Sequence, residues 1–78
     1  MNKTLTDLKV GESATIKGLQ SGDCQNALLA LGFLQGKSVE VTLRAPFRGP
    51  MAVRIGQTLI SLRLEEALQV LIDIPSRR

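Results

Sequence analysis

The spacing of hydrophobic residues changes near the middle of this chain. Residues 24–31 carry them at the three- and four-residue intervals of a helix, whereas residues 39–43 alternate apolar and polar positions as a strand does. Gly32 lies between the two patterns. A residue in the left-handed conformation, which glycine reaches at low cost, commonly ends a helix. The pattern therefore predicts a helix that stops, turns and enters a sheet.

The predicted helix runs from residue 24 to residue 31, and Asp23 precedes it as the expected N-cap. Ala27, Leu28 and Leu31 share one face, which we expect to cover a core. Leu29 points elsewhere. Because a helix of two turns cannot bury leucines on every side, we expect Leu28 or Leu29 to remain accessible.

The alternation after the helix predicts a first hairpin with a long loop over residues 44–50. The predicted inward pairs are Leu43 with Met51, Val41 with Val53, and Val39 with Ile55. This register places Glu40 opposite Arg54 on the outer face, where opposite charges stabilise a strand pair. The loop itself is rich in turn-forming residues.

A second hairpin follows directly, with Gly56 and Gln57 as a two-residue turn. Its predicted pairs are Ile55 with Thr58, Val53 with Ile60, and Met51 with Leu62. Inward alternation is kept throughout, so no bulge is expected here. In this interpretation Leu59 points outward, as does Leu71 on a later strand. An exposed apolar strip of this kind could support self-association or partner binding.

The remaining segments complete a mostly β fold with short helices. Residues 1–12 form a lead-in with a helical turn near Thr6–Leu8, and a strand over Ala14–Lys17 follows with Ala14 and Ile16 inward. After the second hairpin we expect a helical turn over Arg63–Leu68 and then a last strand with Val70, Ile72 and Ile74 inward. Pro75 ends that strand, and residues 76–78 form a frayed tail. We expect the first and last strands to pair. Together these predict one domain, a small, partly open β-barrel of five strands capped by one helix.

Composition argues against enzymatic chemistry and against a metal centre. The chain has no histidine, so the usual general base and the commonest metal ligand are both missing. Cys24 is the only cysteine, which excludes an internal disulfide, and we interpret it as a small half-buried residue. The acidic residues are scattered, and adjacent Glu65 and Glu66 suit the positive end of a helix better than a cation. We therefore expect no catalytic residue, no cofactor and no bound metal.

The net charge of +3 and the two aromatic residues, Phe33 and Phe47, give weak support for nucleic-acid binding. Lys17, Arg44, Arg48 and Arg54 could form a basic stripe, but Glu40 interrupts it in the predicted register. No apolar run approaches the roughly 20 residues that span a bilayer, and the N-terminus lacks the apolar segment of a signal peptide. We expect a cytoplasmic protein without membrane insertion.

Several short segments of the sequence resemble the ferrous iron transport protein A (FeoA) family. The matching residues are Leu8 and Gly11, Leu28–Gly32 with Gly36, Val39–Val41, Ala45-Pro46 with Pro50, Leu62-Arg63 and Glu66-Ala67, and the final apolar strand. The resemblance covers nearly the whole chain. It implies an SH3-like barrel in the bacterial cytoplasm. It also implies an accessory role in Fe(II) uptake through association with FeoB, a membrane protein with a cytoplasmic GTPase domain.

A protein-interaction role needs an exposed apolar surface, and two stretches of the sequence offer one. The candidate partner-binding residues are Leu28, Leu29, Leu31, Phe33 and Phe47. For Leu31 and Phe33 the stronger expectation is a place in the core. The leading hypothesis is a non-enzymatic module that binds FeoB and modulates it. The alternative is a free-standing SH3-like regulatory module that binds a peptide or an iron-responsive transcription regulator.

Overall fold

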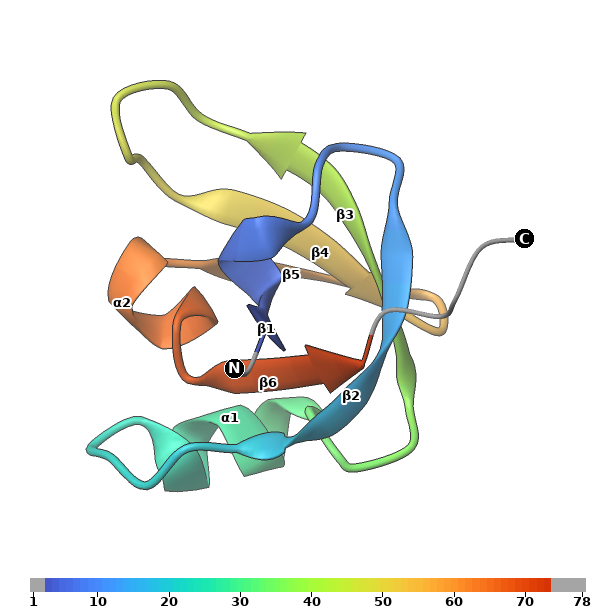
Figure 1. Ribbon diagram of the computed structural model, residues 1–78, viewed down its shortest axis with the longest axis vertical. Coiled ribbons are helices and arrows are strands. Elements are labelled where there is room, and N and C mark those ends of the chain that lie inside the picture. Colours follow the sequence, from blue (N-terminus) through green and yellow to red (C-terminus); the bar gives the residue numbers. More distant parts are fainter. Residues whose placement is uncertain (1–2, 74–78) are drawn as a thin grey trace.

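The computed structural model describes residues 3–73 and contains one antiparallel sheet with three short helices (Figure 1). The elements are β1 (Lys3–Thr4), the 3-10 helix η1 (Leu5–Asp7), β2 (Ser13–Leu19), α1 (Gln25–Leu31), β3 (Ser38–Arg44), β4 (Met51–Ile55), β5 (Thr58–Leu62), α2 (Leu64–Ala67) and β6 (Val70–Asp73). The strand order is β1-β6-β2-β3-β4-β5. Figure 1 shows the sheet curled, with α1 at one end of the molecule and the β3–β4 loop at the other.

The lead-in contributes more than the sequence predicted. It supplies the sixth strand, β1, which pairs with β6, and its helical turn is η1. The backbone N–H of Thr4 donates to Asp7 Oδ2 at 2.9 Å, which caps η1 at its start. Leu5 and Leu8 are both fully buried. Residues 3–12 therefore close one side of the core.

The predicted pairing of the first and last strands is confirmed. Ile16 of β2 lies opposite Ile72 of β6, and both are buried. Val70 is also buried, as the alternation required. The predictions for Ile74, Pro75 and the tail fall outside the described residues.

One apolar cluster fills the interior of the curled sheet. Its members are Leu5, Leu8, Ala14, Ile16, Leu28, Phe33, Val39, Val41, Met51, Val53, Ile60, Leu62, Ala67, Val70 and Ile72. Every strand from β2 to β6 contributes alternate residues to it, together with the helices and the turn after α1. Burial of this set is the main favourable contribution to folding a chain of this size.

The β4–β5 hairpin matches its prediction residue by residue. Met51 pairs with Leu62, Val53 with Ile60, and Ile55 with Thr58. Gly56 has a φ of 62°, whereas Gln57 has no positive φ, which is the arrangement of a type II′ turn. Glycine at the first central position is therefore required by the backbone.

The β3–β4 hairpin departs from its prediction because of a bulge. Val41 pairs with Val53 and Glu40 with Arg54, as predicted, but the register shifts between Val41 and Leu43. Leu43 consequently lies opposite Ala52, and its side chain is 59% exposed. The predicted inward pair of Leu43 with Met51 is wrong, because an extra residue reverses the alternation beyond it.

Helix α1 also differs from its prediction at its first residue. It begins at Gln25, and its N-cap is Cys24, which makes no side-chain capping bond. The prediction of Asp23 as N-cap is therefore wrong. At the other end, Gly32 has a φ of 105° and ends the helix as predicted.

The helix end explains which leucine is buried. The N–H of Phe33 donates to the Leu28 carbonyl at 3.1 Å, and that of Gly32 donates to the Leu29 carbonyl at 3.0 Å. These two bonds define a Schellman motif, which commonly brings the residue after the glycine against the residue five positions earlier. Leu28 and Phe33 are both in the core, whereas Ala27 is exposed and Leu31 is 48% exposed. Of the three residues on the face predicted to cover the core, Leu28 is therefore buried, whereas the burial expected of Ala27 and Leu31 is wrong.

Candidate protein-interaction surfaces

The C-terminal half of α1 and the turn that follows it expose three leucines. Leu29, Leu31 and Leu34 are 42%, 48% and 45% exposed, and we call these three residues the α1 leucines. Leu29 and Leu31 are two residues apart, so they project from different sides of the helix. Their arrangement offers an apolar surface around the helix end.

Two of the predicted contact residues are not part of this surface. Leu28 is 1% exposed and Phe33 is fully buried. A partner could reach neither side chain without unfolding the end of α1, because the Schellman motif turns both inward. The expectation that Phe33 is core is confirmed, whereas the same expectation for Leu31 is wrong. The sequence predicts that either Leu28 or Leu29 remains accessible, and in the structure the accessible one is Leu29.

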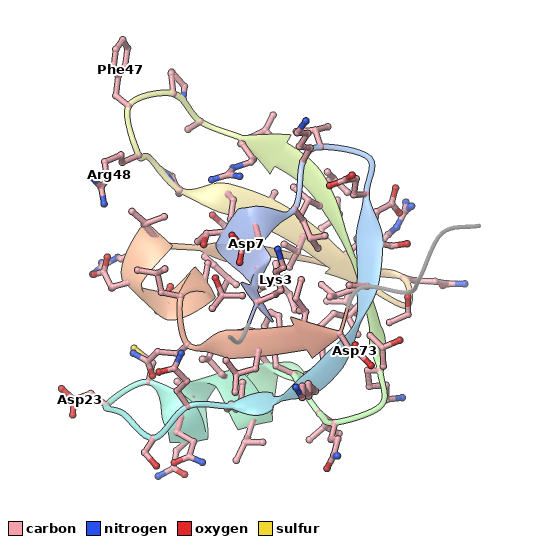
Figure 2. All side chains as sticks on the ribbon, in the orientation of Figure 1. Lys3, Asp7, Asp23, Phe47, Arg48 and Asp73 are labelled. Carbon is pink, nitrogen blue, oxygen red and sulfur yellow. The ribbon has the colours of Figure 1, made fainter. Side chains whose placement is uncertain are left out.

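Phe47 forms the tip of the β3–β4 hairpin and is 98% exposed. Figure 2 shows its ring pointing away from the body of the protein, at the end opposite α1. The loop is closed by the N–H of Ala45, which donates to the Pro50 carbonyl at 2.9 Å. An isolated aromatic ring in water at a hairpin tip contributes nothing to the core, so its contact with another molecule stays a prediction.

The backbone of this tip is strained. Phe47 and Arg48 have φ values of 59° and 61°, and they are the two non-glycine residues with positive φ among residues 3–73. The N–H of Gly49 donates to the Pro46 carbonyl at 3.1 Å, which completes the pattern of a type I′ turn. Asn-Gly is the favoured pair in such a turn, and other residues there cost roughly 1 kcal/mol or more each.

The bulge that exposes Leu43 also sets the position of Arg44. Arg44 pairs with Met51, so it lies on the inner side of the strand beyond the bulge. Its guanidinium donates to the carbonyls of Thr6 and Leu8, at 3.0 Å in each case. Arg44 thus fastens the end of β3 to η1 and to the residue that follows η1. This tie was not visible in the sequence, since nothing in the alternation marks the extra residue.

The basic stripe considered from sequence is divided in the structure. Arg54 forms an ion pair with Glu40 across the outer face, as the predicted register required. Arg44 is turned toward backbone carbonyls. Arg48 lies at the hairpin tip beside Phe47 (Figure 2). The arginines therefore act at separate places on the molecule.

Several acidic side chains accept hydrogen bonds from nearby backbone N–H groups. Asp7 accepts from the N–H of Thr4, and Glu12 Oε1 accepts from the N–H of Lys9 at 2.7 Å. Glu66 Oε1 accepts from the N–H of Arg63 at 2.8 Å, which caps α2 and confirms its predicted role at a helix end. Within the described part of the chain, no three His, Cys, Asp or Glu side chains lie close enough to hold a metal ion. Cys24 is half-buried against the core, as predicted.

These features define the class of the protein, a small SH3-like barrel that exposes apolar side chains at two ends. FeoA of Stenotrophomonas maltophilia, whose crystal structure contains zinc and which is described as a procaryotic SH3 domain protein, superposes with a TM-score of 0.82. The two chains are 30% identical, over 91% of this chain and 89% of that one. A manganese-dependent transcriptional repressor shares the fold alone, with a TM-score of 0.80 and 19% identity over 91% of this chain and 40% of that one. The predicted SH3-like barrel is confirmed.

The particular family follows from the sequence comparison. The model of the FeoA domain family matches residues 3–74. A Fe(2+) transport protein A/Fe(2+) transporter FeoB fusion protein of Porphyromonas gingivalis is 33% identical over 73 residues. The match covers 92% of this chain and 9% of that protein. The chain belongs to the FeoA family, which is linked to ferrous iron transport.

Among the residues that the structure describes, none of the helices is long and apolar enough to cross a bilayer.

Proposed function

We propose that this protein is a non-enzymatic accessory factor of bacterial Fe(II) uptake. In this proposal it acts in the cytoplasm, where it binds the cytoplasmic part of a FeoB-type transporter and modulates its transport or GTPase cycle. The observation that carries the proposal is the fusion of an FeoA-like segment to FeoB in the Porphyromonas gingivalis relative. Two domains joined in one chain have a high effective concentration for each other, so the fusion favours a direct contact.

The α1 leucines are the surface proposed to make this contact. They supply exposed apolar area next to a helix end that the buried Leu28 and Phe33 hold against the core. Binding energy at protein interfaces is concentrated in a few apolar or aromatic anchors that become fully desolvated. Phe47, at the opposite end of the molecule, is proposed as a separate contact.

Modulation requires that the module distinguish two states of its partner. A ligand shifts a conformational equilibrium only by the difference between its affinities for the two states. The proposed action is therefore preferential binding to one conformer of the nucleotide-binding region. The S. maltophilia relative, described as a candidate activating factor of ferrous iron transport, supports this kind of role.

The test is a binding titration with the cytoplasmic part of a FeoB-type transporter. Leu29→Gln and Leu31→Gln are made separately, because the two side chains project from different sides of α1. Leu68→Gln is the matched control, since Leu68 is exposed to the same degree (44%) but lies after α2. We expect at least one α1 variant to bind about tenfold more weakly, while the control binds as the unaltered protein does.

The folded state of each variant is verified first by circular dichroism. Unaltered affinity in both well-folded α1 variants and in Phe47→Ala would exclude Leu29, Leu31 and Phe47 as contacts. Leu28→Gln is not a binding variant, because placing an amide in the core is expected to unfold the protein. Co-purification of a soluble transcription regulator in place of a membrane GTPase would instead support the alternative regulatory module.

A further inference from the structure

The sheet ends in two edge strands of different character. β1 has two residues, one of which is Lys3, so it is short and charged. β5 has five residues, Thr58–Leu62, and contains neither a charged residue nor a proline. Natural proteins usually protect an edge with one of these devices, because unpaired backbone groups attract another strand. The β5 edge lacks that protection.

The hairpin register identifies which backbone groups of β5 face outward. In a two-residue hairpin the residues flanking the turn form a hydrogen-bonded pair, and such pairs recur at every second position. Thr58, Ile60 and Leu62 therefore bond to β4. The N–H and C=O groups of Leu59 and Ser61 point away from it. Within residues 3–73, no backbone hydrogen bond joins β5 to an element other than β4.

We propose that β5 pairs with β5 of a second copy of this chain, antiparallel, about a two-fold axis through Ile60. In this arrangement the N–H and C=O of Leu59 bond to the C=O and N–H of the partner's Ser61, and the reverse pair completes a ring of bonds. Leu59, which is 66% exposed, gains apolar cover from the neighbouring strand. The sheet then continues across both copies.

A second copy fits this edge because the edge is self-complementary. The outward N–H and C=O groups of Leu59 and Ser61 lie symmetrically around Ile60. When the same strand is placed antiparallel beside β5, each donor therefore meets an acceptor without a shift of register. The strand is uncharged, so two copies meet without like-charge repulsion, and continued pairing places Arg63 opposite a neutral Gln57. Isologous contacts of this kind are the commonest route to symmetric dimers. Five residues bury little surface, so we expect weak, reversible pairing.

The test compares Ser61→Pro with Ser61→Ala. Proline removes the outward N–H, which the bonds to β4 do not use, and it is tolerated at such edge positions. Alanine keeps that N–H and removes the hydroxyl. We expect the apparent mass of the unaltered protein and of Ser61→Ala to rise from monomer toward dimer between about 0.1 mM and about 2 mM in sedimentation experiments. Ser61→Pro should remain a monomer throughout.

Amide hydrogen exchange gives a second measurement that needs no variant. At high protein concentration the N–H groups of Leu59 and Ser61 should exchange several-fold more slowly than at low concentration. The N–H of Ile60, bonded to β4, should be protected equally at both. This readout decides the matter even where the proline variant fails to fold.

Three outcomes would overturn the proposal. A protein that stays monomeric with unprotected Leu59 and Ser61 amides has no edge pairing. Equal loss of association in Ser61→Ala and Ser61→Pro would place the contact at the hydroxyl. Protection that appears only when the cytoplasmic part of a FeoB-type transporter is added would assign the edge to a strand of that partner. The FeoB binding titration is unaffected by the first two results, so the two proposals fail independently.

Discussion

Strand β4 belongs to two hairpins, and the two are built in different ways. Its pairing with β5 is regular, and a glycine occupies the one left-handed position of its turn. Its pairing with β3 contains a bulge, and the loop places Phe47 and Arg48 in left-handed conformations. One hairpin follows local rules throughout, while the other departs from them at three residues. Departures of this kind are most often found where a protein makes functional contacts.

Of these features, the bulge is expected to contribute most to the free energy of unfolding, because it sets the position of Arg44. Arg44→Ala removes two charge-assisted hydrogen bonds to the carbonyls of Thr6 and Leu8, and should lower the free energy of unfolding by about 2 kcal/mol. Urea denaturation followed by circular dichroism measures this, since the chain has neither tryptophan nor tyrosine. Arg54→Ala is the matched control and should cost less than about 1 kcal/mol. Equal effects of the two variants would mean that the tie to η1 contributes little.

In the turn of the regular hairpin, replacing the glycine at the first central position is expected to lower stability. Gly56→Ala forces a side chain into a conformation with a φ of 62°, which should destabilise the protein by about 1 kcal/mol. Gln57→Ala, at the neighbouring position without a positive φ, should be nearly neutral. The comparison is made in the same denaturation experiment. A neutral Gly56→Ala would show that the turn relaxes to another type.

These two hairpins also show how far the sequence alone leads. The register from Met51 to Leu62 could be predicted in full, because the alternation is unbroken and a glycine marks the turn. The side of Leu43 could not, since a bulge adds one residue without a sequence signal. At α1 the sequence did carry the signature of a Schellman motif, since Leu28 lies five residues before Phe33 and Gly32 lies between them. Helical periodicity alone assigned Leu31 to the core. That assignment is wrong because the helix ends at this residue and the chain turns away from the helical path.

Relief of the strain at the hairpin tip should change stability in the opposite direction. The double variant Phe47→Asn/Arg48→Gly introduces the pair favoured in a type I′ turn. We expect a gain of about 1 kcal/mol in the free energy of unfolding, partly offset by the greater freedom of glycine in the unfolded chain. The same variant should bind the FeoB-type partner more weakly if Phe47 is a contact. Higher stability with unaltered binding would show that the ring has no part in the complex.

The smallest expected effect belongs to the ion pair that joins β3 to β4 before the bulge. Glu40 and Arg54 lie on the outer face, and their side chains are 35% and 48% exposed, so water and salt screen their attraction. Glu40→Gln should lower the free energy of unfolding by about 0.5 kcal/mol at low salt and by less at about 1 M NaCl, where the Debye length falls to about 3 Å. Denaturation at the two salt concentrations measures the difference. A loss as large as that of Arg44→Ala, unchanged by salt, would mean that this pair and not the tie to η1 fixes the register of the irregular hairpin.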